Sequence, residues 1–101
     1  MSLDIAILGP EGSPKKQISI GADDHHRLME LIGGKGLLAR LNDYYADAEF
    51  EPSEVEDLMS EATALSIRCN NDKQLFSFLS GLIELCRIAR SDGTSLVAIA
   101  D

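Results

Sequence analysis

The second half of the chain shows the hydrophobic spacing of amphipathic helices. After Ser53 an apolar residue returns every three or four positions, which is the helical period. These apolar positions are Val55, Leu58, Met59, Ala62, Leu65 and Cys69. The following segment, from Lys73 to about Arg90, is apolar around most of its circumference. A helix of that kind is normally central and covered on several sides, so we expect the second helix to lie against most of the core.

Shorter apolar segments near the two ends of the sequence predict strands. Leu3 to Leu8 alternates loosely, and Lys15 to Ile20 places Ile18 and Ile20 on one face. The glycines and prolines between these segments are turn residues, so the two strands should form a hairpin with a longer loop. Ser95 to Ala100 reads as a final strand. Because a lone hairpin is marginal in water, we expect this strand to join it.

The middle of the chain predicts shorter helices. Asp23 or Asp24 can cap a helix that runs to about Ile32, where the glycines at 33 and 34 stop it. The leucines at 37, 38 and 41 suit a short helix reaching residues 42–45, and we expect residues 46–52 to be irregular.

Two local signals mark where the later helices begin. Ser53 as N-cap with Glu56 three residues later has the pattern of a capping box. Asn71 or Asp72 can cap the last helix.

These elements occur in the order ββααααβ. They predict one α+β domain over residues 1–101, in which a small antiparallel or mixed three-stranded sheet packs against helices in two layers. At 101 residues and 45% hydrophobic composition, the chain can bury one core without metal or disulfides.

Composition narrows the classes of function. A formal charge of −8 and a pI near 4.6 argue against nucleic-acid binding, which needs a basic surface. No apolar run is long enough to span a membrane, and the start of the sequence lacks the pattern of a signal peptide. Cys69 and Cys86 fall on the apolar faces of predicted helices, so we interpret both as reduced core residues. Together these observations favour the cytoplasm.

The negative charge is concentrated in one window. Between Arg40 and Arg68 no basic residue interrupts eight of the seventeen acids, namely Asp43, Asp47, Glu49, Glu51, Glu54, Glu56, Asp57 and Glu61. Such a run needs free solvent or a cationic partner. Tyr44 and Tyr45 lie among these acids, and tyrosine is enriched at binding hot spots. The alternatives are therefore a docking face for a basic protein and a solvated face that keeps the protein soluble.

Metal and catalytic patterns fit poorly. A calcium-binding loop counted from Asp47 would need Gly at its sixth position and Glu at its twelfth, where Pro52 and Leu58 stand. His25 and His26 are adjacent, so on a helix they point about 100° apart and cannot easily share one metal ion. We expect no cofactor and no metal.

Two further patterns are incomplete. The glycine-rich run around Lys35 lacks the spacing of a phosphate-binding loop, so it reads as a helix stop, and we do not expect Lys35 alone to bind phosphate. A cysteine paired with a histidine is formally available as a nucleophile, but nothing nearby in the sequence would activate the thiol.

Two stretches resemble a known group of proteins. Ser2 to Leu8, continued through Ile18 to Gly21, and Leu41 to Phe50 resemble small acidic bacterial immunity proteins of polymorphic toxin and contact-dependent growth-inhibition systems. The resemblance implies a protein that binds the toxic C-terminal domain of its cognate toxin, often a basic nuclease, and blocks its active site.

The sequence therefore favours a binding protein over an enzyme. Combining the charge window with the resemblance, we expect the partner-binding residues to be Asp43, Tyr44, Tyr45, Asp47, Glu49, Glu51 and Glu54. The alternatives are an acidic regulatory or adaptor protein with another basic partner, and a small metal-dependent enzyme. The exposed edge of a small sheet could also pair with a second copy, which would give a homodimer.

Overall fold

The computed structural model contains one antiparallel sheet. It describes residues 2–9, 12, 14–43 and 46–100. Its strands are β1 (Leu3–Leu8), β2 (Pro14–Ile20), β3 (Ala48–Phe50) and β4 (Leu96–Ala100), hydrogen-bonded in the order β2-β1-β4-β3. β4 therefore lies between β1 and β3, although it follows all the described helices in the sequence.

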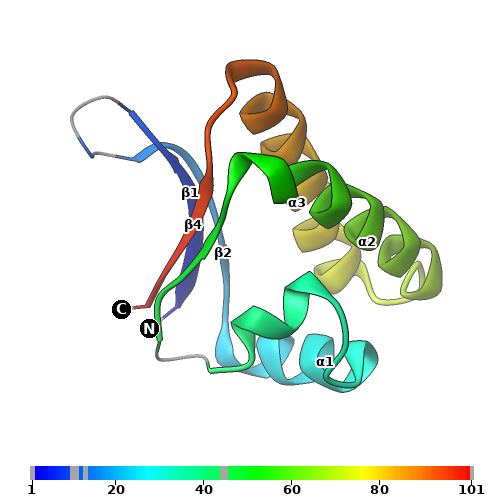
Figure 1. Ribbon diagram of the computed structural model, residues 1–101. Helices are drawn as coiled ribbons and strands as arrows, with labels where there is room; N and C mark the ends of the chain where they lie inside the picture. The colour runs from blue at the N-terminus through cyan, green and yellow to red at the C-terminus, as the bar shows by residue number, and fades with distance from the viewer. Residues whose placement is uncertain (1, 10–11, 13, 44–45, 101) are drawn as a thin grey trace.

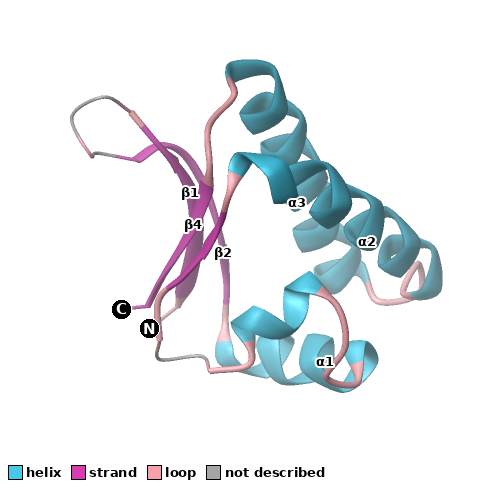
Figure 2. Cartoon of the chain, viewed as in Figure 1, coloured by secondary structure: helices cyan, strands magenta, loops and turns pink. Residues whose placement is uncertain are grey.

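The helices cover one face of this sheet (Figures 1 and 2). They are α1 (Ala22–Ile32), the 3-10 helices η1 (Leu37–Leu41) and η2 (Pro52–Glu54), α2 (Val55–Arg68) and α3 (Lys73–Asp92). α3 contacts β1, β2 and β4, and α2 packs mainly against α3. The α+β class predicted from the sequence is confirmed.

The strand register separates the two faces of the sheet. Leu3, Ile5 and Ile7 of β1 are fully buried or nearly so and point toward the helices, and Ile5 pairs with Ile18 and with Ala98. Since successive side chains alternate, the intervening residues lie on the other side, which we call the open face. Its side chains are Asp4, Ala6, Leu8, Gln17, Ser19, Glu49, Val97 and Ile99.

The core lies between the sheet and the helices. Leu79, Leu82, Leu85 and Cys86 of α3 are completely buried. The predicted central position of this helix is therefore correct. Phe50 is the largest of the fully buried side chains in the described ranges, and it reaches the core from β3.

β3 is not expected from the sequence. The segment 46–52 is predicted to be irregular, but Ala48, Glu49 and Phe50 pair with Ala98, Val97 and Leu96 of β4. The sheet therefore has four described strands instead of three. The short helix expected after residue 36 is a 3-10 helix that ends at Leu41. Three residues are too few to show an alternating pattern, and it is the pairing with β4 that holds them extended.

The helix starts show one correct and two incorrect predictions. Asp72 caps α3, since its Oδ1 accepts a hydrogen bond from the Leu75 N–H at 3.2 Å. Ser53 is not the N-cap of α2, because it lies inside η2, and the capping box is formed by Glu51 and Glu54. α1 starts after Gly21, so Asp23 and Asp24 lie in its first turn and do not cap it.

Candidate functional site

An apolar groove runs along the open face of the sheet. Leu8 of β1 and Val97 and Ile99 of β4 supply its large apolar side chains, and all three are partly exposed. Asp47 and Glu49, before and within β3, line the same groove and are exposed. The groove thus combines an apolar floor with a carboxylate rim.

Within the described ranges, the strand residues of the open face include acids but neither Lys nor Arg. Asp4 stands on it beside β2, and Asp47 and Glu49 stand at the β3 side. The lysines of β2 are directed to the helical side of the molecule. Lys15 forms an ion pair with Asp92 of α3 at 3.3 Å. Lys16 is close enough to α3 to help Arg87, the main cause, lower the pKa of Glu84.

Of the seven partner-binding residues predicted from the sequence, the five that the structure describes fall in three places. Asp47 and Glu49 line the groove. Glu51 and Glu54 lie at the ends of η2, and Asp43 is exposed just after η1. Tyr44 and Tyr45 lie outside the described residues. The structure therefore brings two of the seven together on the open face.

Glu54 has a structural role. Arg40 forms an ion pair and hydrogen bonds with its carboxylate, and the Glu51 N–H donates to Glu54 Oε1 at 3.0 Å. The bond from Arg40, and after it the bond from the Glu51 backbone, lower the pKa of Glu54 to about 2. Arg40 also donates to the Glu49 carbonyl and lies 5.5 Å from the centre of the Phe50 ring. Glu54 thus fastens η2 to β3 through Arg40.

Asp47 also has a local contact. Its Oδ1 accepts a hydrogen bond from the Ala100 N–H at 2.9 Å, which extends the contact between the β3 and β4 segments. Glu49 differs, because its backbone carbonyl accepts from Arg40 whereas its carboxylate has no hydrogen bond or ion pair with the other described residues. Glu49 is therefore the acid of the groove most available to a partner.

The sequence alone does not point to the apolar part of the groove. It identifies Leu8, Val97 and Ile99 only as strand residues. The signal that could have found them is the alternation of side chains between the two faces of β1 and β4. Because the helices cover only one face, every second residue of these strands lies on the other.

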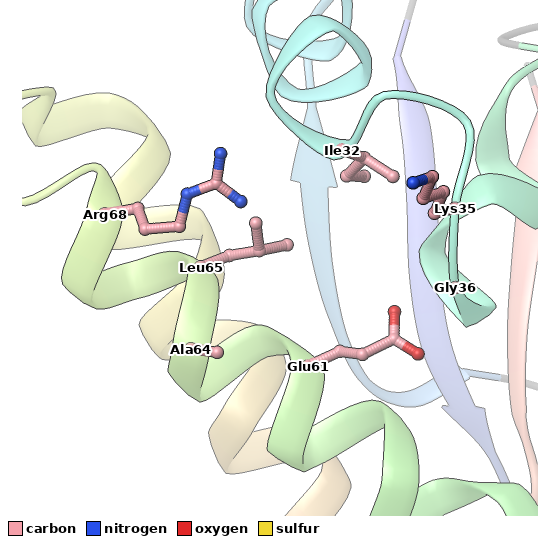
Figure 3. A pocket seen from close by; sticks show the side chains of 7 residues that line it. All are labelled: Ile32, Lys35, Gly36, Glu61, Ala64, Leu65 and Arg68. Atoms are coloured by element: carbon pink, nitrogen blue, oxygen red, sulfur yellow. The ribbon is translucent and has the colours of Figure 1, made fainter.

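A second hollow lies in the helical layer, between the end of α1 and α2 (Figure 3). It has a volume of about 280 Å³, and we call it the Lys35–Arg68 pocket. It is lined by Ile32, Lys35, Gly36, Glu61, Ala64, Leu65 and Arg68. The carboxylate of Glu61 accepts hydrogen bonds from the N–H groups of Leu37 at 2.7 Å and Leu38 at 3.2 Å, at the start of η1.

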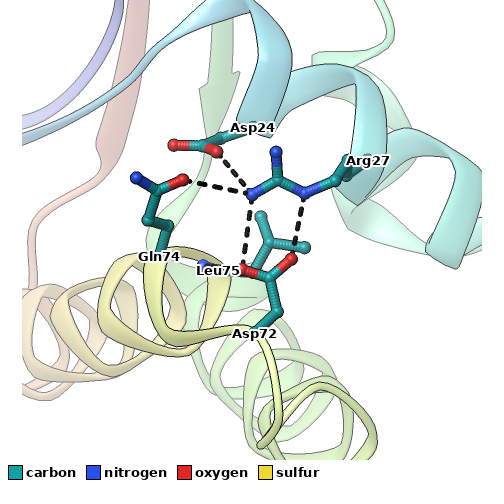
Figure 4. Close-up of polar contacts among 5 residues, drawn as sticks. All are labelled: Asp24, Arg27, Asp72, Gln74 and Leu75. Atoms are coloured by element: carbon teal, nitrogen blue, oxygen red, sulfur yellow. Dashed lines mark hydrogen bonds and ion pairs between the residues drawn. The ribbon is translucent and has the colours of Figure 1, made fainter.

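A polar cluster joins α1 to the start of α3 (Figure 4). Arg27 donates through Nε to Asp72 at 2.9 Å and through Nη2 to Asp24 at 2.6 Å. The Arg27 bond, followed by the Leu75 backbone bond, lowers the pKa of Asp72. Since Asp72 is at once the N-cap of α3 and the partner of Arg27, this cluster explains how α1 is oriented.

The histidines and cysteines have separate local environments. His25 is buried and its Nε2 bonds to the Leu41 carbonyl, whereas His26 is exposed and pairs with Glu30 at 2.7 Å. Burial raises the pKa of Cys86 to about 12, and burial followed by the charge of Asp72 raises the pKa of Cys69. Within the described ranges, no three His, Cys, Asp or Glu residues gather in a way that could hold a metal ion.

Comparisons with protein-family models, with curated proteins and with solved structures found no match. None of the helices in the described part of the chain combines the length and apolarity that crossing a membrane requires. Function is therefore inferred from the geometry of the groove.

Proposed function

We propose that this protein binds a basic protein partner through the open face of its sheet. The observation that carries the proposal is the apolar groove of Leu8, Val97 and Ile99 with Asp47 and Glu49 at its rim. In the form that the sequence resemblance implies, the partner is the toxic domain of a cognate toxin, and the protein acts as its immunity protein in the cytoplasm.

The apolar floor supports binding because it supplies the area that association needs. Four-stranded antiparallel sheets commonly leave one face in water, and that face then reads as polar. Here β4 presents Val97 and Ile99 on the side away from the helices, next to Leu8 of β1. Covering such a strip with partner side chains removes apolar area from water, which is the main favourable contribution to most protein association.

The charges on the open face select the partner. Asp4, Asp47 and Glu49 share this face with no Lys or Arg from the described strands, because the lysines of β2 turn toward α3. A basic surface would meet complementary potential there, which mainly speeds association and disfavours acidic partners. The overall charge of −8 acts in the same direction at longer range.

The residues that contact the partner under this proposal differ from those expected from the sequence. Glu49 and Asp47 remain partner-binding candidates, together with Leu8, Val97 and Ile99. Glu51 and Glu54 belong to the cap of η2. Asp43, Tyr44 and Tyr45 stay predictions from the sequence.

The test begins with capture of partners by the tagged protein from its native cells at low and at high salt. The captured partner is then purified, and its affinity is measured for the wild type and for two charge-reversal variants. Glu49→Lys changes the groove, and Asp57→Lys changes an exposed acid on α2 in the same sequence window. We expect Glu49→Lys to weaken binding by about tenfold and to reduce the salt dependence. Asp57→Lys should change the affinity by less than about twofold.

Three results would contradict the proposal: no specific partner at either salt, an acidic partner, or equal effects of the two variants. Co-expression with the partner decides between an immunity protein and a regulatory or adaptor protein. Rescue of cell growth by the wild type, and weaker rescue by Glu49→Lys, supports the immunity role. A basic partner without toxicity would make the protein a regulatory or adaptor protein.

A further inference from the structure

We infer that the Lys35–Arg68 pocket binds a small organic anion, specifically a monocarboxylate with a short apolar body. This site is independent of the proposed partner surface, because it lies between α1 and α2 in the helical layer, on the other side of the sheet from the open face.

The charge of the pocket favours an anion. Lys35 and Arg68 place two cations around it, and Figure 3 shows both side chains directed toward the hollow. Neither cation forms an ion pair with another described residue. With Glu61 as the one acid among the described lining residues, the pocket carries a formal charge of +1 in a protein of charge −8. It is thus a local site for one negative charge on an acidic molecule.

Glu61 is held at the start of η1 and forms no ion pair with Lys35 or Arg68. Its Oε2 accepts from the Leu37 N–H at 2.7 Å and its Oε1 from the Leu38 N–H at 3.2 Å. Gly36 permits this approach, since a Cβ at that position would lie 2.6 Å from Oε1. The carboxylate is therefore fixed at the start of η1. Its charge offsets only one of the two cations, which leaves a net positive charge in the pocket for a ligand.

The shape and lining of the pocket limit the size of the ligand. Ile32, beside Lys35, and Leu65, beside Arg68, provide apolar walls between the two cations, and Ala64 adds a small side chain to the lining. The volume of about 280 Å³ is just below the range of about 300–1,000 Å³ of typical ligand pockets. It therefore suits a ligand of only a few carbons.

The formal charge of the pocket decides between kinds of anion. A carboxylate carries one negative charge and matches the planar fork of an arginine. A phosphate monoester carries about −1.5 to −2 at neutral pH, which exceeds the net +1 of the pocket. A hydrophobic body on the carboxylate then makes use of Ile32 and Leu65.

The test is a titration of the full chain in which the amide NMR spectrum is recorded at each ligand concentration. The probes are sodium hexanoate and, as the cation of matched length, hexylamine. We expect hexanoate to produce saturable shifts in the amides of residues 32–38 and 61–68, with a dissociation constant in the millimolar range. Hexylamine should produce none there. Lys35→Met and Arg68→Met should each weaken hexanoate binding by about tenfold, the value of one charge-assisted hydrogen bond.

Two controls keep the result interpretable. Lys73→Met removes one positive charge from α3 outside the pocket and should leave hexanoate binding unchanged. Arg68→Lys keeps the positive charge but loses the planar guanidinium group. Its affinity for hexanoate should therefore lie between those of the wild type and Arg68→Met. If Arg68→Met does not fold, Arg68→Lys should still bind hexanoate more weakly than the wild type. Equal binding of hexylamine, unchanged binding by Lys35→Met, or shifts spread evenly over the molecule would overturn the inference. Glu49→Lys should not affect this titration. The inference about the Lys35–Arg68 pocket can therefore fail or succeed independently of the proposed function.

Discussion

Gly36 shows how a single position can depend on a distant side chain. Its φ of 86° and ψ of −175° fall in a region that is essentially restricted to glycine. A Cβ there would also meet the carboxylate of Glu61 at 2.6 Å. The backbone conformation therefore requires glycine, and a side chain there would also displace the flexible carboxylate of Glu61 from its hydrogen bonds to η1. Gly34 also has a positive φ, of 76°, but a Cβ added to it would meet nothing within 4 Å.

We expect Gly36→Ala to lower the free energy of unfolding by about 1 to 3 kcal/mol through backbone strain and loss of the Glu61 contact. Gly34→Ala is the matched control, and it should be less destabilising because it meets only backbone strain. Urea unfolding followed by circular dichroism measures both. If the two variants were equally stable, the close approach of Glu61 would have no energetic weight.

The elements are joined by a small number of polar contacts at their ends. Asp72 is the clearest case, because it caps α3 through the Leu75 N–H and binds Arg27 of α1. The two roles can be separated by substitution. Asparagine can still accept the bond from the backbone, but it lacks the charge that attracts Arg27.

Asp72→Ala should therefore lower the Tm by about 4 to 8 °C or more, since it loses both the cap and the bridge. Asp72→Asn should lower it by clearly less, and Arg27→Met should resemble Asp72→Asn. Thermal unfolding of the three variants at one pH checks the order. A Tm for Asp72→Asn as low as that for Asp72→Ala would show that the bridge, and not the cap, fixes the start of α3.

The elements predicted correctly from the sequence are those with long periodic patterns. α2 and α3 show helical spacing over 14 and 20 residues, and β1 has six residues with a buried alternate face. β3 has three residues and depends on β4, which is distant in the sequence. The predicted capping box is misplaced by two residues because the pattern favours Ser53 as N-cap, whereas the first turn begins at Pro52 and makes Glu51 the N-cap with Glu54 at N3.

The same missing strand hides the candidate site from sequence reasoning. Without β3, nothing in the sequence says that Asp47 and Glu49 share one face, or that Glu54 turns toward Arg40. The acidic window therefore looks like one surface in the sequence, while the structure distributes its acids over a groove, a 3-10 helix and α2.

At the scale of the whole molecule, the core can be probed through its two thiols. Cys86 is completely buried on α3, whereas Cys69 is 7% exposed at the end of α2. The end of a helix opens more easily than the centre of a core. The two residues therefore report local and global opening separately.

In the native protein, iodoacetamide should modify Cys86 roughly a thousandfold or more slowly than in the urea-unfolded chain, because only globally unfolded molecules expose it. Cys69 should react faster through opening of the last turn of α2. Mass spectrometry of the digested protein gives both rates, and Cys69→Ser isolates the Cys86 reaction. Modification of Cys86 at the rate of Cys69 would show that α3 is not the stable centre of the fold.

The position of β4 in the sheet also has a consequence for the order in which the strands can pair during folding. β4 pairs Ala100 with Leu3 on one side and Leu96 with Phe50 on the other. Pairing of segments so distant in the chain is slow to form, and β3 has no place in the sheet until it has happened. Glu49 thus joins Val97 and Ile99 only after β3 has paired with β4. A chain without this pairing would have no groove to offer, so under the proposed function the partner would recognise finished molecules alone.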